Sequence, residues 1–256
     1  MNEQPAVLTD ARERVLVITI NRPDQRNAVN RAVAEGMARA LDELDKEPGL
    51  SVGVIIGAGT GFCAGMDLKA FVAGERPYAG DRGFAGITQR SADKPLIAAV
   101  EGFALAGGLE VALACDLIVA ARGARLGIPE VKRSLVAAAG ALLRLPQTLP
   151  RTIAMELALT GEPMPAERAY ELGLVNRLTE PGEALTAALE LAQTIAANGP
   201  LALAATKRIM VEAADWQQSE FFDRQQEIVA PVMSSEDARE GAVAFAEKRP
   251  PEWKGR

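Results

Sequence analysis

The stretch KPLIAAVEGFALAGGLEVALACDLIVAA, Lys94 to Ala121, decides how the chain is interpreted. Two apolar runs, Leu96–Val100 and Leu117–Ala120, predict strands, and the glycines between them lead into a helix expected to begin near Gly107. The stretch is long enough to cross a membrane, but three acidic residues and several glycines interrupt it. We therefore expect these elements to lie in the core of an α/β protein.

The same kind of pattern continues on both sides of this stretch. Val15–Ile20 and Val52–Ile56 predict further strands, and Asn30 is expected to cap a helix between them. The pattern becomes wholly helical after the Asn-Gly-Pro sequence that starts at residue 198. The sequence thus predicts an α/β core over residues 1–197, built on a repeated strand–strand–helix order, and a helical C-terminal region over residues 198–256.

Composition excludes several classes of function. The chain has 256 residues, 48% of them hydrophobic, which suits one large domain with or without a smaller appendage, and its net charge of −6 disfavours nucleic acid as the main partner. The absence of histidine removes Ser-His-Asp and Cys-His catalysis and most zinc sites. Two cysteines, Cys63 and Cys115, and a polar N-terminal segment without a visible signal peptide predict a reducing, cytoplasmic location.

Two glycine-rich loops each follow an apolar strand. Gly59–Ala64 matches the loose dinucleotide pattern GxGxxA, but it does not lie in the first strand–turn–helix unit, so a turn without ligand is favoured over a nicotinamide site. Gly102–Gly108 leads directly into the predicted helix that carries Glu110. The first N–H groups of a helix lack partners within it, so this loop can receive an oxygen that becomes negative during a reaction.

Two glutamates follow in apolar surroundings. Taken alone, Glu110 is explained by a favourable interaction with the helix dipole, and Glu130 by an exposed loop position beside Lys132 and Arg133. Taken together, two carboxylates joined by a helix and a returning strand can converge on one pocket and divide the roles of acid and base. We expect Glu110 to be mostly ionised because of the helix dipole, and Glu130 to be protonated because of desolvation.

These motifs resemble those of the crotonase superfamily, and specifically of enoyl-CoA hydratases. The resemblance rests on Lys94–Ala121 and on FCAGMDLK (Phe62–Lys69) and GIPE (Gly127–Glu130), and it extends from about Val15 to Lys254. It implies a spiral of ββα units with a helical C-terminal region for assembly as a trimer or a dimer of trimers. It also implies an acyl-CoA thioester as substrate and a reaction that needs no metal or redox cofactor. The net charge and the interrupted apolar stretch predict that neither nucleic acid nor a membrane is a partner.

The resemblance also implies roles for individual residues. The backbone N–H groups of Met66 and Gly107 would form an oxyanion hole for the thioester oxygen. Glu110 would activate water and Glu130 would exchange a proton with the α-carbon, so that trans-2-enoyl-CoA becomes 3-hydroxyacyl-CoA. The residues expected near CoA, the last two of them from another subunit, are Arg26, Ala28, Ala64, Asp67, Leu68, Lys69, Phe245 and Lys248.

Departures from the family pattern concern the acyl pocket. Met66 stands where many hydratases have alanine, and Ala106 and Ala138 each replace a glycine. The apolar run Val136–Leu143 would suit a fatty or sterol-derived acyl chain. The alternatives are an enoyl-CoA isomerase or another reaction of the superfamily, a non-catalytic acyl-CoA binder, and a dehydrogenase using GxGxxA; the presence of both glutamates favours hydration.

Overall fold

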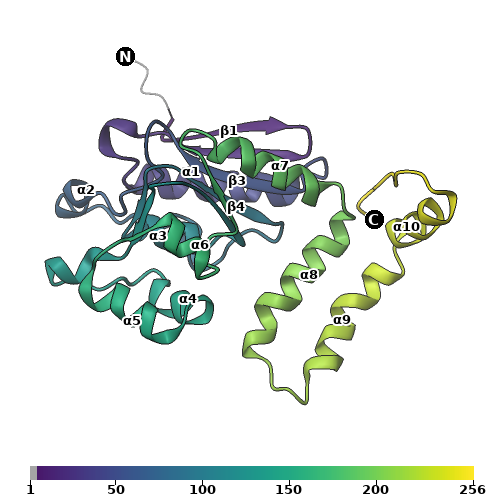
Figure 1. Ribbon diagram of the computed structural model, residues 1–256. Coiled ribbons are helices and arrows are strands. Elements are labelled where there is room, and N and C mark those ends of the chain that lie inside the picture. The colour runs from purple at the N-terminus through teal and green to yellow at the C-terminus, as the bar shows by residue number, and fades with distance from the viewer. Residues whose placement is uncertain (1–4) are drawn as a thin grey trace.

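The computed structural model describes residues 5–256, and a twisted sheet lies at its centre (Figure 1). The strand order is β1-β2-β3-β4-β6-β9, and β1 pairs antiparallel with β2 while the other neighbours are parallel. The strands are β1 (Val7–Arg12), β2 (Val15–Ile20), β3 (Val52–Gly57), β4 (Leu96–Val100), β6 (Leu117–Ala121) and β9 (Arg177–Thr179). A smaller sheet of β5 (Phe103–Leu105), β7 (Arg125–Gly127) and β8 (Met164–Pro165) lies beside it.

Helices cover the sheet and extend the chain beyond it. The longer ones are α1 (Arg31–Lys46), α5 (Arg151–Thr160), α7 (Ala184–Ala196), α8 (Pro200–Glu212), α9 (Phe221–Met233) and α10 (Glu236–Glu247). The shorter ones are α2 (Leu68–Val72), α3 (Gly107–Leu113), α4 (Ala141–Thr148) and α6 (Ala166–Glu171), with 3₁₀ turns η1 (Pro23–Gln25), η2 (Gly80–Arg82), η3 (Pro129–Arg133) and η4 (Ala213–Asp215). None of the helices within residues 5–256 has the length and apolar character needed to span a bilayer.

The expected α/β class and the principal strands are confirmed. β2 and β4 have the predicted bounds, and the helix capped by Asn30 is α1, where the Asn30 side chain accepts a hydrogen bond from the Val33 N–H. The edge strand β1 was not predicted because its sequence, VLTDAR, is polar and mostly exposed. The strands of the smaller sheet are two or three residues long, too short to show a period.

Two apolar clusters lie on opposite faces of the main sheet. Successive side chains of β3 point to opposite faces of the sheet. Ile55 therefore packs in the larger cluster, which includes residues of α1, whereas Val52 and Val54 pack in the smaller cluster with residues of α7. The face of α7 that meets the sheet consists of alanines spaced four residues apart, at positions 184, 188, 192 and 196. Small side chains let this helix approach the sheet closely, so the central strands are buried on both faces.

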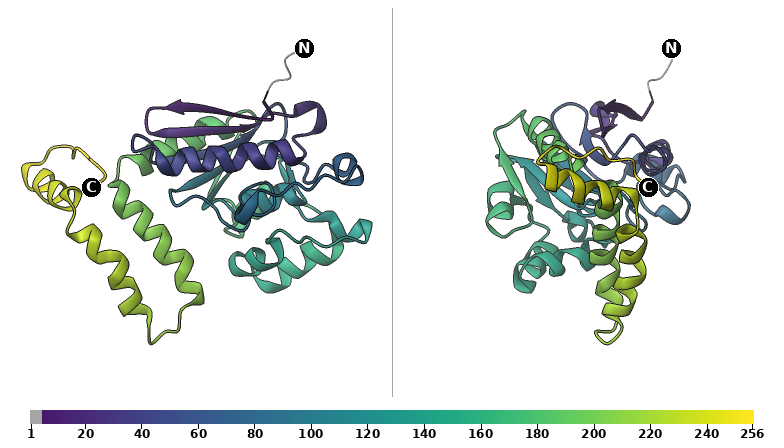
Figure 2. Two further views of the ribbon diagram at one scale, coloured as in Figure 1. Left: turned by 180° about the vertical axis from the view of Figure 1, so that it is seen from behind. Right: turned by 90° about the vertical axis from the view of Figure 1, so that its right-hand side faces the viewer.

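The C-terminal helices extend away from this core. Figures 1 and 2 show α8 and α9 side by side and projecting beyond the sheet, with α10 following them. A lysine of α8, Lys207, ties the region back to the core, because its Nζ donates to Asp116 Oδ2 at 2.7 Å and to the Lys94 carbonyl at 2.9 Å. The boundary expected at residues 197–198 falls in the link between α7 and α8, and it stays a prediction.

The turn around Asn27 holds the first glycine loop in place. Asn27 is 1% exposed; its Nδ2 donates to the carbonyls of Ala58 and Gly61, both at 2.8 Å, and its Oδ1 accepts from the Arg22 N–H at 3.0 Å. The next residues pair with the end of the loop, because Val29 N donates to the Gly65 carbonyl at 2.8 Å. The position of residues 57–67 therefore depends on a buried amide 30 residues earlier in the chain.

We expect the isosteric change Asn27→Asp to lower the free energy of unfolding by about 2–4 kcal/mol. The new carboxyl loses the amide that serves two buried carbonyls, and leaving a buried polar group without its partner is costly. Denaturant unfolding measures the change. The matched control is Asn30→Asp, which is expected to alter stability little because asparagine and aspartate cap helices about equally well. Equal losses in the two variants would contradict the role given to Asn27.

Candidate active site

The two glycine loops meet edge to edge. Leu105 N donates to the Cys63 carbonyl at 3.0 Å, and Cys63 pairs with Ala104 in an isolated parallel bridge. Gly65 lies so near the start of α3 that a Cβ at this position would be 3.0 Å from the Gly107 nitrogen. Gly65 also has φ +96°, a left-handed conformation that favours glycine. The loops from β3 and β4 are thus brought together by backbone contact that a side chain at residue 65 would obstruct.

This contact leaves two neighbouring backbone donors available. Within residues 5–256, neither Met66 N nor Gly107 N donates a hydrogen bond to another protein group, whereas Gly65 and Asp67 on either side of Met66 are bonded. Both residues line the same cavity. Two unpaired N–H groups on a cavity wall can receive an oxygen that gains negative charge, which is the geometry expected of an oxyanion hole.

Ala106, immediately before Gly107, carries backbone strain. Its φ of +52° and ψ of −131° lie in a region that is populated almost entirely by glycine. Glycine is also the residue that the family pattern has at this position. Such a conformation costs about 1–3 kcal/mol and persists only where the surroundings enforce it. Ala106 N donates to the Gly127 carbonyl at 2.8 Å, so pairing with β7 helps to hold the strained turn that presents Gly107.

Glu110 lies in the first turn of α3, and its side chain is held by the backbone of a distant segment. The residue is 3% exposed, and its Oε1 accepts hydrogen bonds from Ala139 N at 2.7 Å and Ala141 N at 3.1 Å. Burial raises the pKa of Glu110, while these two N–H groups and the charge of Arg144 act in the opposite direction. The expectation based on the helix dipole was incomplete, because the sequence did not show how deeply the carboxyl is buried or which groups hold it.

Glu130 lies in the first turn of η3, directly after the strand β7. The sequence around Glu130 shows no helix start, but Pro129–Arg133 forms a short 3₁₀ helix. Its Oε2 is buried and accepts no hydrogen bond from the described residues. Desolvation, aided by the negative charge of Glu110, raises the pKa of Glu130 to about 7. A carboxyl of this kind can both deliver and accept a proton near neutral pH.

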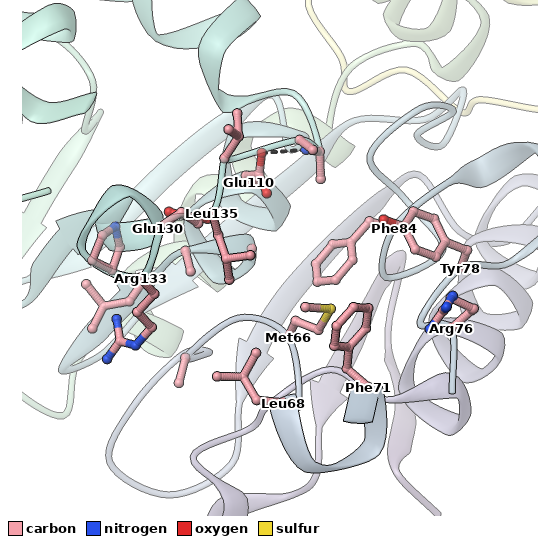
Figure 3. A pocket seen from close by; sticks show the side chains of 18 of the residues that line it. Met66, Leu68, Phe71, Arg76, Tyr78, Phe84, Glu110, Glu130, Arg133 and Leu135 are labelled. Atoms are coloured by element: carbon pink, nitrogen blue, oxygen red, sulfur yellow. Dashed lines mark hydrogen bonds between the residues drawn. The ribbon is translucent and has the colours of Figure 1, made fainter. Parts of the chain in front are cut away.

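Both carboxyls face one cavity of about 540 Å³. Figure 3 shows Glu110 and Glu130 on one side of it and Phe71, Phe84 and Arg76 on the other, with Met66 between the two groups. Its remaining lining is mostly apolar and includes Leu68, Leu105, Tyr78, Leu135, Val136, Ala138 and Ala139. The carboxyl pair and the two free N–H groups therefore converge on a space large enough for a small acyl group.

The sequence interpretation missed one wall of this cavity. Phe71, Arg76, Tyr78 and Phe84 come from α2 and from the irregular segment that follows it, which carries no periodic pattern. The ring of Phe84 packs on Gly107, with its nearest atoms 2.6 Å from where a Cβ would stand. A cluster of aromatic residues in an otherwise aromatic-poor chain, 4% in all, was the signal that could have marked this segment.

The GxGxxA loop serves the internal structure of the protein. The carbonyl of Gly61 accepts from Asn27, and a Cβ on Gly61 would lie 2.3 Å from the ring of Phe103. The loop continues through the bridge at Cys63 to Met66, and α2 begins only at Leu68. The interpretation of this loop as a turn without ligand stays a prediction.

Comparison with known proteins identifies the family of the chain. The family model described as enoyl-CoA hydratase/isomerase matches residues 10–256. The chain belongs to the enoyl-CoA hydratase/isomerase family. The crystal structure of an enoyl-CoA hydratase from Mycobacterium tuberculosis H37Rv is similar to it, with a TM-score of 0.97 and 60% identity over 99% of this chain and 100% of that chain. The expected crotonase-like fold, with its helical C-terminal region, is thereby confirmed.

Relatives within the family carry more than one name. An enoyl-CoA hydratase of Mycobacterium tuberculosis is 42% identical over 98% of this chain and 97% of the relative. A carnitinyl-CoA dehydratase of Shigella flexneri is 44% identical over 94% of this chain and 95% of the relative. A crystal structure described as carnitinyl-CoA hydratase from Mycobacterium avium has a TM-score of 0.80 and 45% identity over 99% of this chain and 100% of that chain.

The residues that the family resemblance places near CoA fall into three groups. Arg26, Ala64 and Leu68 line the cavity, and the guanidinium of Arg26 lies 4.4 Å from the centre of the Phe103 ring. Ala28, Asp67 and Lys69 form the second group and do not line the cavity. Asp67 caps α2 and forms an ion pair with Arg22 at 3.0 Å, and Arg22 also donates a hydrogen bond to the Ala28 carbonyl. Lys69 borders a neighbouring groove.

The C-terminal pair forms the third group. Phe245, on α10, is 88% exposed, and Lys248 is the left-handed C-cap of the same helix. Neither residue lines the cavity of its own chain. A contribution to CoA binding from a neighbouring subunit stays a prediction.

We expect the pKa of Glu130 to make stability depend on pH. A carboxyl whose pKa rises from 4.5 to about 7 on folding stabilises the folded state at low pH, and this contribution is lost as pH rises through about 7. The unfolding temperature of the native chain should therefore fall relative to that of Glu130→Gln between about pH 5 and pH 8. Thermal unfolding followed by circular dichroism measures the unfolding temperature of each protein. The control Glu35→Gln, at an exposed position of α1, should track the native chain; a constant difference for Glu130→Gln would contradict the raised pKa.

Proposed function

We propose that the chain is an enoyl-CoA hydratase, a hydro-lyase that adds water to trans-2-enoyl-CoA to give 3-hydroxyacyl-CoA. The observation that carries the proposal is the convergence of Glu110, Glu130 and two unbonded N–H groups on one cavity. The hydratase and dehydratase names of its relatives support an acyl-CoA thioester as substrate and a reversible addition or elimination of water.

Each group has a part in the proposed reaction. The thioester oxygen accepts hydrogen bonds from Met66 N and Gly107 N, which stabilise the enolate-like transition state. Ionised Glu110 takes a proton from water as the water oxygen bonds to the β-carbon. Protonated Glu130 delivers its proton to the α-carbon. Transfer of the proton from Glu110 to Glu130 then restores the starting state of both carboxyls. The proposed reaction therefore needs neither a metal nor a redox cofactor.

The difference in environment supports this division of labour. Glu110 accepts two backbone hydrogen bonds, which favour its carboxylate form, whereas Glu130 Oε2 accepts none from the described residues and its pKa is about 7. Two carboxyls in one cavity whose protonation states differ are suited to act as base and acid.

The identity of the acyl group is the finer part of the proposal. We propose a fatty or related apolar acyl chain, as in β-oxidation, because the cavity wall is apolar around Phe71, Leu135 and Val136. Exposed apolar residues on the C-terminal helices, among them Met210, Phe222 and Met233, support assembly as a trimer or a dimer of trimers. The two cysteines, both free thiols, underlie the proposed cytoplasmic location.

We expect the purified protein to bleach the conjugated enoyl-thioester absorbance of short-, medium- or long-chain trans-2-enoyl-CoA. The dehydrated thioester that corresponds to carnitinyl-CoA is tested as a further substrate, because some relatives are named carnitinyl-CoA dehydratases. The double variant Glu110→Gln/Glu130→Gln is the inactive control. Tight acyl-CoA binding without loss of absorbance from any substrate would favour a non-catalytic binder. Conversion of 3-enoyl-CoA without hydration would favour an isomerase.

We expect Glu110→Gln and Glu130→Gln each to lower kcat about 10²–10⁴-fold while acyl-CoA affinity changes little. The two variants should differ in exchange of the α-proton with deuterated solvent, measured by mass spectrometry. Glu130→Gln should abolish the exchange, because Glu130 is the group assigned to the α-carbon, and Glu110→Gln should retain part of it. Native-level exchange in both variants would refute this assignment.

A further inference from the structure

Arg144 lies behind the cavity, on the far side of the segment that holds Glu110. It belongs to α4 and is half-buried, and it does not line the cavity that contains the two carboxyls. Its Nη2 donates to the Thr88 carbonyl at 2.7 Å, and its Nη1 donates to the Ala139 carbonyl at 3.5 Å. The guanidinium therefore links two segments that are about 50 residues apart in the chain and that both border the cavity.

The segment that Arg144 holds is the one that binds Glu110. Ala139 N and Ala141 N donate to Glu110 Oε1, and Arg144 contacts the carbonyl of the same Ala139. The guanidinium lies against Gly140 so closely that a side chain at that position would overlap it. The two hydrogen bonds to Glu110, at 2.7 and 3.1 Å, therefore come from a segment that Arg144 contacts from behind.

The other end of the link reaches the opposite wall. Thr88 N donates to the Phe84 carbonyl at 3.2 Å, and the Phe84 ring packs on Gly107. Thr88 is buried and its Oγ1 has no hydrogen-bond partner among the described residues, so the polar contacts of this residue run through its backbone: its N–H to Phe84 and its carbonyl to Arg144. Arg144 thus joins the aromatic wall to the segment that positions the proposed base.

The charge of Arg144 acts on Glu110 as well. The titratable groups nearest this pair are Glu130 across the cavity and Cys115 on the outer side. Arg144 also borders an outer groove, whose charged lining consists of the Asp116–Lys207 ion pair and of Arg90, Asp93, Arg208, Glu212 and Glu227. Burial raises the pKa of the Cys115 thiol, so it stays neutral near pH 7. Arg144 is therefore the cation that opposes the burial of the Glu110 carboxylate.

We propose that Arg144 is a positioning residue for water activation: it clamps residues 139–141 against Thr88 so that Glu110 is held in place and ionised. The inference rests on the proposed function, since it assigns a support to the base of the hydration reaction. It differs from a packing role, because both the hydrogen-bonding fork and the positive charge of the guanidinium are needed.

Two replacements of Arg144 separate these features. Arg144→Met keeps most of the side-chain volume but removes charge and donors, and Arg144→Lys keeps the charge. In Arg144→Met we expect kcat to fall about 10²-fold with KM little changed. The acidic limb of the kcat profile should move up by about one pH unit, because an opposite charge no longer favours the carboxylate. In Arg144→Lys the limb should stay near its native position while kcat is partly restored.

A lower kcat at every pH, with the acidic limb of both variants unmoved, would overturn the proposal and leave a packing role. If Arg144→Met does not fold, as judged by circular dichroism, Arg144→Gln supplies a neutral variant that retains an N–H donor. The acidic limb of the kcat profile is expected to shift in Arg144→Gln as it does in Arg144→Met.

A second measurement does not need the reaction. Titration of ¹³C-labelled glutamate carboxyls by NMR, with the Glu110 signal assigned from Glu110→Gln, should show a higher pKa of Glu110 in Arg144→Met than in the native chain. If the native chain hydrates no enoyl-CoA but this shift is present, the proposed function fails and the link between Arg144 and Glu110 stands. An unchanged pKa of Glu110 would overturn the link whether or not the native chain is active.

Discussion

The backbone contact between Gly65 and the start of α3 is the constraint on which the rest of the site depends. A Cβ at residue 65 would lie 2.8 Å from the Ala106 side chain and 3.0 Å from the Gly107 nitrogen, so the two loops meet without an intervening side chain. This approach places two backbone N–H groups, one from the loop after β3 and one from the start of α3, on one cavity wall. Because backbone donors cannot rotate away as side chains do, they are well suited to stabilise developing charge.

The surroundings of this contact keep it in place. On one side, the amide of Asn27 binds the Gly57–Gly65 loop through two carbonyls, and on the other, β7 receives the N–H of the strained residue Ala106. The phenyl ring of Phe84 packs against Gly107. A conformation that is unfavourable for alanine by itself is thus enforced by neighbours on three sides, as is common where backbone geometry serves a site.

The two carboxyls show how position alone can separate chemically identical groups. Glu110 and Glu130 are both partly or fully removed from water, and burial is the largest influence on the pKa of each. Glu110 is compensated by two N–H groups and by Arg144, whereas Glu130 faces the charge of Glu110 and has an oxygen without a partner among residues 5–256. A carboxylate and a carboxylic acid can therefore coexist in one cavity near neutral pH.

Much of the architecture could be predicted from the sequence, because it rests on local patterns. The apolar runs that became β2 and β4, the capping asparagine of α1 and the glycines before α3 all act through residues close together in the chain. The motifs around Met66, Glu110 and Glu130 likewise identified the residues that meet at the cavity. What tertiary structure alone decided involves residues far apart: the amides of Ala139 and Ala141 that hold Glu110, the aromatic wall from Phe71 to Phe84, and the link from Arg144 to Thr88. No short-range pattern encodes the contacts of Glu110 and Arg144, since hydrogen bonds that span 29 to 56 residues arise only when the chain has folded.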